Sequence, residues 1–150
     1  MLCKNYYTGR KYRGRGNGVN GLICKCGSIL RYKVGDTIQN GVYRWHISTY
    51  CCNCGSATEI DGTGFEDIPT EVRQEIIGKY GEWEILAASQ LSKINYLMKK
   101  LLVNCNIATK SGNPFMIYRG TKNQIFWIKG QLIEKGIPES ALLVQPLSPL

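Results

Sequence analysis

Two stretches of sequence decide the fold: "GLICKCGSIL" at residues 21–30 and "STYCCNCGSATEI" at residues 48–60. Each places cysteines one or two residues apart, continues with Cys-Gly-Ser, and lies beside residues that favour β-strands. Cysteines this close in sequence rarely form a useful disulfide with each other, but two of them can bind one tetrahedral ion from a tight turn. The two stretches together therefore predict one metal site built from two turns.

The cysteine pattern favours a metal site over a disulfide framework. The chain has seven cysteines, an odd number, and its N-terminus lacks the apolar stretch of a secretory signal. Cys24 and Cys26 would supply one pair of thiolates, and Cys51 and Cys54 the other. A glycine follows the second cysteine of each pair, which allows a sharp turn with backbone N–H groups directed at sulfur. We expect one structural Zn²⁺ with no vacant coordination position.

Two other residues are alternative ligands. Cys52 with Cys54 would repeat the one-residue spacing of the first pair, but we prefer Cys51 because a two-residue spacing is the commoner ligand pattern. His46, the only histidine, could replace a cysteine. Its place in an alternating strand favours a surface or half-buried side chain instead.

Residues 22–60 resemble the zinc-ribbon family, in which two cysteine-bearing turns, called knuckles, lie at hairpin tips joined by β-strands. "YCCNCGSATEI" at residues 50–60 matches the usual knuckle of two cysteines separated by two residues and followed by glycine. "CKCGS" at residues 24–28 has one intervening residue, so it implies a tighter first knuckle and leaves the subtype open. The resemblance implies a small β-rich module held together by zinc.

The sequence around the knuckles alternates as short strands. These are "SILRYKV" (28–34), "VYRWHIS" (42–48) and "ATEI" (57–60), with turn signals at "VGD" (34–36) and "QNGV" (39–42). We assign residues 21–62 to this module. The stretch "DGTGFEDIP" (61–69), with two glycines, three acidic residues and a proline, indicates a connector, which we assign to residues 63–69.

The period of the apolar residues becomes helical after Pro69. Thr70 is expected to cap a helix over 71–80 that ends at Gly81, and Thr121 to cap a helix over 121–136. A further helix is expected over 91–102, and strands over 82–87, 114–118 and 140–147. The expected inner helix faces comprise Val72, Ile76, Ile77, Tyr80, Leu91, Ile94, Leu97, Met98, Leu101, Leu102, Ile125, Ile128, Leu132 and Ile133. Glu82 and Glu84 are expected to face water.

The fold class predicted from these patterns is α+β, with a small β-rich zinc ribbon followed by a compact α-β-α-β-α-β domain over residues 70–150. Residues 82–147 are similar to the C-terminal domain of the bacterial ribosomal stalk protein, through "EWEILAASQLSKINYLMKKLL" (82–102) and "NPFMIYRGTKNQIFWIKGQLIEKGIPESALLV" (113–144). In that family the first helix and a glycine- and lysine-rich segment after it recruit translational GTPases. Here the segment "VNCNIATKSG" (103–112) is shorter and lacks that pattern. The resemblance therefore implies only a small docking module.

The net charge of +8 is concentrated at one end of the chain. Residues 1–35 hold eight basic and no acidic side chains, whereas the remainder holds eleven of each. Such a segment is typical of proteins that bind polyanions, because neutralising phosphates releases counterions, although a solvated tail that maintains solubility is the alternative. The candidate contacts are Lys4, Arg10, Lys11, Arg13, Arg15, Lys25, Arg31 and Lys33. The arm over residues 1–20 also carries tyrosines that can stack on bases.

The sequence shows no arrangement that requires catalysis. It has one histidine, and neither a Gly-x-Ser-x-Gly elbow nor a phosphate-binding loop between a strand and a helix. We predict a non-enzymatic adaptor whose arm and zinc ribbon contact nucleic acid, with RNA favoured over DNA, or a ribonucleoprotein. The C-terminal domain would dock a protein. No apolar run approaches 18 residues, so we expect no membrane partner and a cytoplasmic location, or the inside of a virion if the protein is viral.

Two other functions remain open. The chain could be a structural component of a larger particle, a virion or a ribonucleoprotein. It could also be an inhibitory or immunity protein that sequesters a protein partner.

Overall fold

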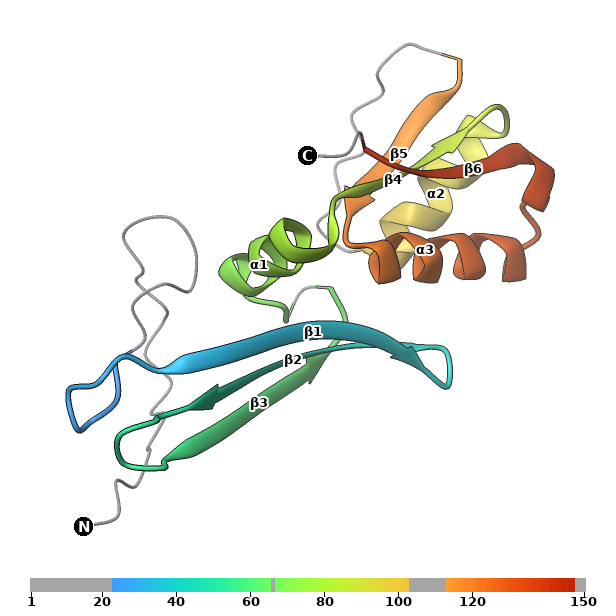
Figure 1. Ribbon diagram of the computed structural model, residues 1–150. Helices are drawn as coiled ribbons and strands as arrows, with labels where there is room; N and C mark the ends of the chain where they lie inside the picture. Colours follow the sequence, from blue (N-terminus) through green and yellow to red (C-terminus); the bar gives the residue numbers. More distant parts are fainter. Residues whose placement is uncertain (1–22, 66, 103–112, 148–150) are drawn as a thin grey trace.

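The computed structural model describes residues 23–65, 67–102 and 113–147. This part of the chain forms two three-stranded antiparallel sheets and three α-helices (Figure 1). Their order is β1 (Arg31–Gln39), β2 (Val42–Tyr50), β3 (Ala57–Thr63), α1 (Thr70–Tyr80), β4 (Trp83–Ala87), α2 (Leu91–Leu101), β5 (Phe115–Gly120), α3 (Lys122–Glu134), the 3₁₀ turn η1 (Glu139–Ala141) and β6 (Leu142–Pro146). The predicted α+β class and the predicted order of elements are confirmed.

The first sheet is a meander in the order β1-β2-β3. Asn40 and Gly41 join β1 to β2 with φ of 50° and 74°, the backbone of an Asn-Gly hairpin turn, so the turn predicted at residues 39–42 is confirmed. The turn predicted at residues 34–36 is wrong, because Gly35 lies inside β1 opposite His46. A Cβ on Gly35 would lie 2.6 Å from the His46 ring. The glycine therefore makes room for a side chain and does not turn the strand.

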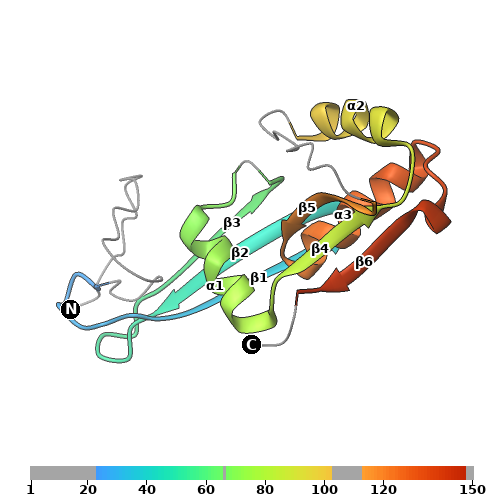
Figure 2. The same cartoon turned by 90° about the horizontal axis from the view of Figure 1, so that it is seen from above.

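Helix α1 covers one face of the first sheet (Figures 1 and 2). The shared core consists of Val34, Tyr43, Trp45, Ile47, Ile68, Val72 and Ile76. The predicted domain over residues 70–150 includes this helix, but its buried side packs on the strands of the first sheet. Thr70 does not cap it: the N-cap is Pro69, without a side-chain hydrogen bond, and Gly81 ends the helix at φ 87° as predicted. Tyr80, which was predicted to lie on the inner face of this helix, is exposed. The buried face of α1 is therefore narrower than the spacing of its apolar residues predicted.

The second sheet has the order β5-β4-β6, and α2 and α3 pack on it through a second core. That core contains Ile85, Ala87, Ile94, Met98, Leu102, Phe115, Ile117, Ile125, Ile128, Leu132, Ile137 and Leu142. Thr121 caps α3 in a reciprocal capping box with Gln124, which confirms the predicted start. Leu91 and Ile133 are exposed, and their assignment to inner faces was wrong.

Glu84 is buried rather than directed at water, which corrects the expectation for this residue. Its side chain lies on the central strand β4, and the residue is 6% exposed. The carboxylate accepts hydrogen bonds from Arg119 Nε on β5 at 3.0 Å and from Gln145 Nε2 on β6 at 2.8 Å. A buried carboxylate is tolerated here because both neighbouring strands supply donors.

Phe65, between β3 and α1, joins the two cores. Its ring centroid lies 4.8 Å from that of Tyr43, 5.1 Å from that of Trp127 and 5.8 Å from that of Tyr118. Helix α3 also contacts the tip of the first hairpin, where Trp127 Nε1 donates to the Gly41 carbonyl at 2.8 Å. The two sheets are therefore packed together through aromatic side chains.

Among the helices described, none is both long and apolar enough to cross a bilayer.

Candidate metal centre

Two tight turns present the cysteines at one end of the first sheet. In the first turn, the Cys24 N–H donates to the Ser28 carbonyl at 2.9 Å and the Gly27 N–H donates to the Cys24 carbonyl at 2.8 Å. Gly27 has φ 86°, a backbone conformation that residues with a Cβ rarely adopt. The second turn repeats this closure, because the Cys51 N–H donates to the Ser56 carbonyl at 2.8 Å. Gly27 and Gly55, with φ of 86° and 73°, thus allow the sharp turns that were predicted at these positions.

The structure brings together the four cysteines that the spacing singled out. The Sγ atoms of Cys24, Cys26, Cys51 and Cys54 all lie within 4.8 Å of one another. Two separations, 3.5 Å for Cys24–Cys54 and 3.5 Å for Cys26–Cys51, join one turn to the other. A disulfide would need about 2.05 Å. Sulfurs around one tetrahedral Zn²⁺ at about 2.3 Å are separated by about 3.8 Å. The arrangement therefore fits a single ion shared by both turns.

The two alternative ligands lie outside this group. Cys52 is exposed and its sulfur does not join the other four, whereas Cys51 is fully buried. His46 is half-buried in the middle of β2, with its ring against Gly35. No cysteine in the described part of the chain forms a disulfide.

The two cysteine turns, residues 24–28 and 51–56, have very little apolar core of their own; because they could hold a metal, they are called the metal turns below. In the described residues, the buried cluster at this end consists of Cys24, Leu30 and Cys51, with Cys54 packed against it. Three buried residues supply far less apolar area than a stable unit needs. A bound ion is the element that would hold these turns together, since metal binding contributes directly to folding free energy in such small modules.

The surroundings of Cys26 and Cys24 shift the pKa values of these two thiols in opposite directions. Hydrogen bonds from the hydroxyl and backbone N–H of Ser28, and then from the Asn53 amide, lower the pKa of Cys26 to about 5. A backbone hydrogen bond from Cys26 lowers the pKa of Cys24, but burial and the neighbouring thiols outweigh it and raise this pKa to about 11. The Asn53 Nδ2 lies 3.6 Å from the Cys26 sulfur. Ser28 and Asn53 were not among the predicted site residues, because the cysteine spacing alone does not single them out, although both lie in the two turns.

The predicted nucleic-acid contacts are only partly described by the structure. Lys25 is exposed in the first turn, and Arg31 and Lys33 are exposed on β1, alternating with the more buried Tyr32 and Val34. The other candidates, Lys4, Arg10, Lys11, Arg13 and Arg15, lie outside the described residues, as does the segment 103–112. The three predicted contacts that the structure describes therefore lie in the first cysteine turn or on the strand that follows it.

No protein-family model matches this chain, and no curated protein or solved structure matches it. The zinc-ribbon and ribosomal-stalk resemblances remain hypotheses drawn from the sequence.

Proposed function

We propose that this chain is a non-enzymatic adaptor in which a structural zinc ion shapes a β-sheet module that binds nucleic acid. The observation that carries the proposal is the convergence of four Sγ atoms, from two separate turns, within 4.8 Å. Four thiolates complete a tetrahedral shell, so the ion would have no open position for a substrate. The role of such a site is to fold and orient the surface around it.

Zinc is the metal that best fits this donor set. Soft thiolate ligands in tetrahedral geometry select zinc or iron, and calcium or magnesium would require oxygen ligands. Zinc is also the usual ion where four cysteines come as two close pairs. Direct metal analysis separates zinc from iron.

The charge distribution supports a nucleic-acid partner. The basic excess of the whole chain falls within residues 1–35. Among the basic residues of this segment, Lys25 lies exposed in the first metal turn, and Arg31 and Lys33 lie exposed just after it. An ion that fixes this turn would also fix the positions of these cations relative to a phosphate backbone. We favour RNA over DNA, or a ribonucleoprotein, and assign the second sheet with α2 and α3 to protein docking.

A charge-matched pair of variants tests the proposal. The triple change K25A/R31A/K33A and the triple change K93A/K99A/K100A on α2 remove the same charge from exposed lysines and arginine. Binding of a fluorescent single-stranded RNA would be measured by anisotropy over a range of salt concentrations. We expect the first variant to weaken binding and to reduce the slope of log K against log salt by up to about 2, since each single-strand contact contributes about 0.7.

The second variant should bind like the unchanged protein. Zinc near one equivalent in each purified sample would show that the ribbon is intact. Protein without bound metal, or two triple variants with the same affinity and salt slope, would contradict the proposal.

A further inference from the structure

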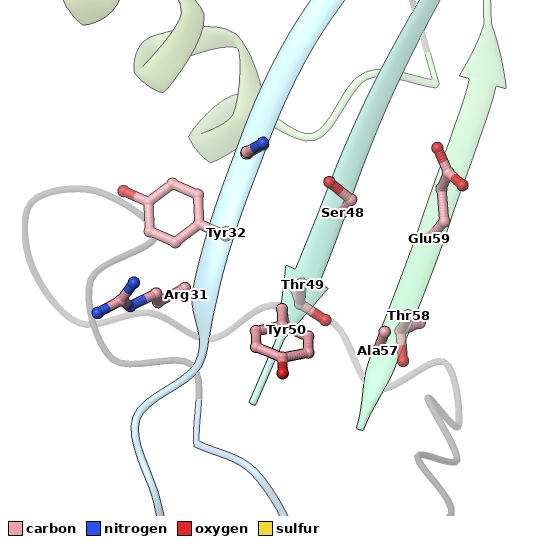
Figure 3. Close-up of a pocket in the computed structure, with 9 residues that line it drawn as sticks. Arg31, Tyr32, Ser48, Thr49, Tyr50, Ala57, Thr58 and Glu59 are labelled. Carbon is pink, nitrogen blue, oxygen red and sulfur yellow. The ribbon is translucent and has the colours of Figure 1, made fainter. Parts of the chain in front are cut away.

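A cavity of about 660 Å³ opens on the first sheet beside the metal turns. Figure 3 shows side chains from all three strands around it. The described lining residues are Arg31, Tyr32, Lys33, Ser48, Thr49, Tyr50, Ala57, Thr58 and Glu59. Its volume lies within the range of about 300–1,000 Å³ that is usual for small-ligand sites. The lining combines aromatic rings, cations and a few polar groups.

The metal turns fix one wall of this cavity. Tyr50 is the last residue of β2 and is 49% exposed, and the next residue, Cys51, is fully buried in the sulfur cluster. Ala57 begins β3 directly after the second turn, opposite Tyr50 in the sheet. The backbone that carries the Tyr50 ring is therefore held from the cysteine side and from the neighbouring strand.

The strand register shows which lining groups share a face of the sheet. Alternate side chains of a strand point to opposite faces, and directly paired residues share one. Tyr50 and Ser48 therefore lie on the same face as Arg31, Lys33 and Glu59. Thr49 lies on the opposite face, with the core residues Tyr43, Trp45 and Ile47. An exposed aromatic ring, two cations and a carboxylate thus meet on one side of the cavity.

We propose that the cavity binds one unstacked base of a single-stranded nucleic acid, an inference that rests on the proposed function and specifies its site. The Tyr50 ring would stack on the base. Arg31 and Lys33 lie on the neighbouring strand, where they would contact the phosphates on either side. Aromatic stacking with flanking cations is how proteins hold unpaired bases.

Glu59 indicates which bases fit. A carboxylate in the lining repels a phosphate, so the cavity suits the base and not the backbone. A carboxylate accepts hydrogen bonds from exocyclic amino groups, which cytosine, adenine and guanine carry and uracil lacks. The geometry therefore favours an amino-bearing base over uracil.

Lys33 also indicates the path that the nucleic-acid backbone would take along the protein surface. It lines a second cavity of about 460 Å³ along β1, together with Lys79 of α1 and Lys122 of α3. The acidic residue of that cavity, Asp36, is already hydrogen-bonded by Asn123 at 2.9 Å. A backbone leaving the first cavity past Lys33 would enter a second one rich in lysine.

The experiment measures binding of labelled ten-nucleotide homopolymers of C, A and U by anisotropy, with full-length protein. Tyr50→Leu should weaken binding to oligo(C) about tenfold, because it removes the stacking ring, and Tyr50→Phe should stay within about twofold. Tyr96→Leu, at an exposed tyrosine of α2, is the matched control and should change nothing. Zinc content equal to that of the unchanged protein confirms an intact ribbon in each variant.

Glu59→Gln tests the base preference separately. The unchanged protein should bind oligo(C) and oligo(A) more tightly than oligo(U), and this ratio should fall toward one in Glu59→Gln. Deoxyribose oligomers of the same sequence form a second arm. Tighter binding of the ribose strands assigns the ligand to RNA, and equal binding assigns the site to either nucleic acid.

Two results would overturn the base cavity without overturning the proposed function. They are equal affinities of Tyr50→Leu and Tyr96→Leu, and an oligo(U) affinity equal to that of oligo(C), while the salt-dependent loss in K25A/R31A/K33A persists. A zinc-loaded protein that binds no oligomer at any salt concentration would end the proposed function itself.

Discussion

The carboxylate of Asp36 on β1 accepts a hydrogen bond from the hydroxyl of Thr121, the N-cap residue of α3. The same hydroxyl oxygen accepts from the Gln124 N–H at 3.1 Å. Asn123 adds a bond from Nδ2 to the other carboxylate oxygen at 2.9 Å. One acidic side chain of the first sheet therefore completes the start of a helix in the second core. This is a polar counterpart to the aromatic contacts of Phe65.

Asp36→Ala should destabilise the whole protein by about 2–3 kcal/mol, because charge-assisted bonds to buried donors are lost. Burial and the nearby Asp36 raise the pKa of Tyr43, so its hydroxyl stays protonated and donates to Asp36 at 3.1 Å. Urea denaturation at neutral pH measures the change in midpoint. Asp61→Ala on β3, at an exposed carboxylate, should change stability by less than about 0.5 kcal/mol. Equal midpoints for the two variants would show that Asp36 does not join the sheets.

Cys51→Ser and Cys52→Ser provide an adjacent pair that tests the ligand set. Cys51 is buried in the sulfur group, and Cys52 is exposed outside it. We expect Cys51→Ser to lose most of its zinc and Cys52→Ser to retain about one equivalent, because serine is a poor zinc ligand at neutral pH. Metal analysis after dialysis against a weak chelator gives the answer. Metal loss in the Cys52 variant alone would show that Cys52, and not Cys51, is the metal ligand.

Metal affinity should rise steeply with pH, because the thiols must lose their protons to bind the ion. Cys24 has a pKa of about 11, so across the neutral range each binding event releases its proton and the affinity rises at least about tenfold per pH unit. Cys26, with a pKa of about 5, is already deprotonated there and adds its own proton only below about pH 5. Competition with a zinc-binding dye at about pH 6 and about pH 8 should show a change of about 100-fold or more. An affinity that is flat with pH would contradict thiol ligands.

Gly62→Ala and Gly78→Ala should change stability in opposite directions. A Cβ on Gly62 would lie 2.5 Å from Cζ2 of the buried Trp45 ring, so the ring must move and the cost is about 1–3 kcal/mol. Gly78 lies in α1 with open space around its Cα, and alanine there should stabilise by about 0.5–1 kcal/mol. Thermal unfolding of both variants would reveal the signs. A neutral Gly62→Ala would mean that the sheet yields at this position.

Local chemistry made part of this structure predictable. The Asn-Gly pair fixed a hairpin turn, and Thr121 followed by Gln124 three residues later fixed the start of α3, because both depend only on neighbouring residues. The cysteine spacing likewise indicated which sulfurs converge. Cys51 directly follows β2 and is buried, whereas Cys52 lies in the turn and is exposed, which agrees with the preference for a two-residue spacing.

Features set by distant residues were not predictable from the sequence. Glu84 is buried because Arg119 and Gln145, far along the chain, lie on the two strands beside it. The helical spacing of the apolar residues predicted which side of α1 is buried. It did not predict that the first sheet covers that side. A glycine followed by an aspartate, as at Gly35, is typical of a turn. The pairing of β1 with β2 shows instead that Gly35 lies in a strand and leaves space for the His46 ring.

Phe65 has a consequence for how this protein can be divided. Its ring contacts Tyr43 from the first sheet together with Tyr118 and Trp127 from the other core. Any fragment that separates the halves leaves an aromatic surface uncovered, whichever half keeps the ring. Exchanging one half for an unrelated module would expose the same surface, so we expect each half to be stable only in the presence of the other.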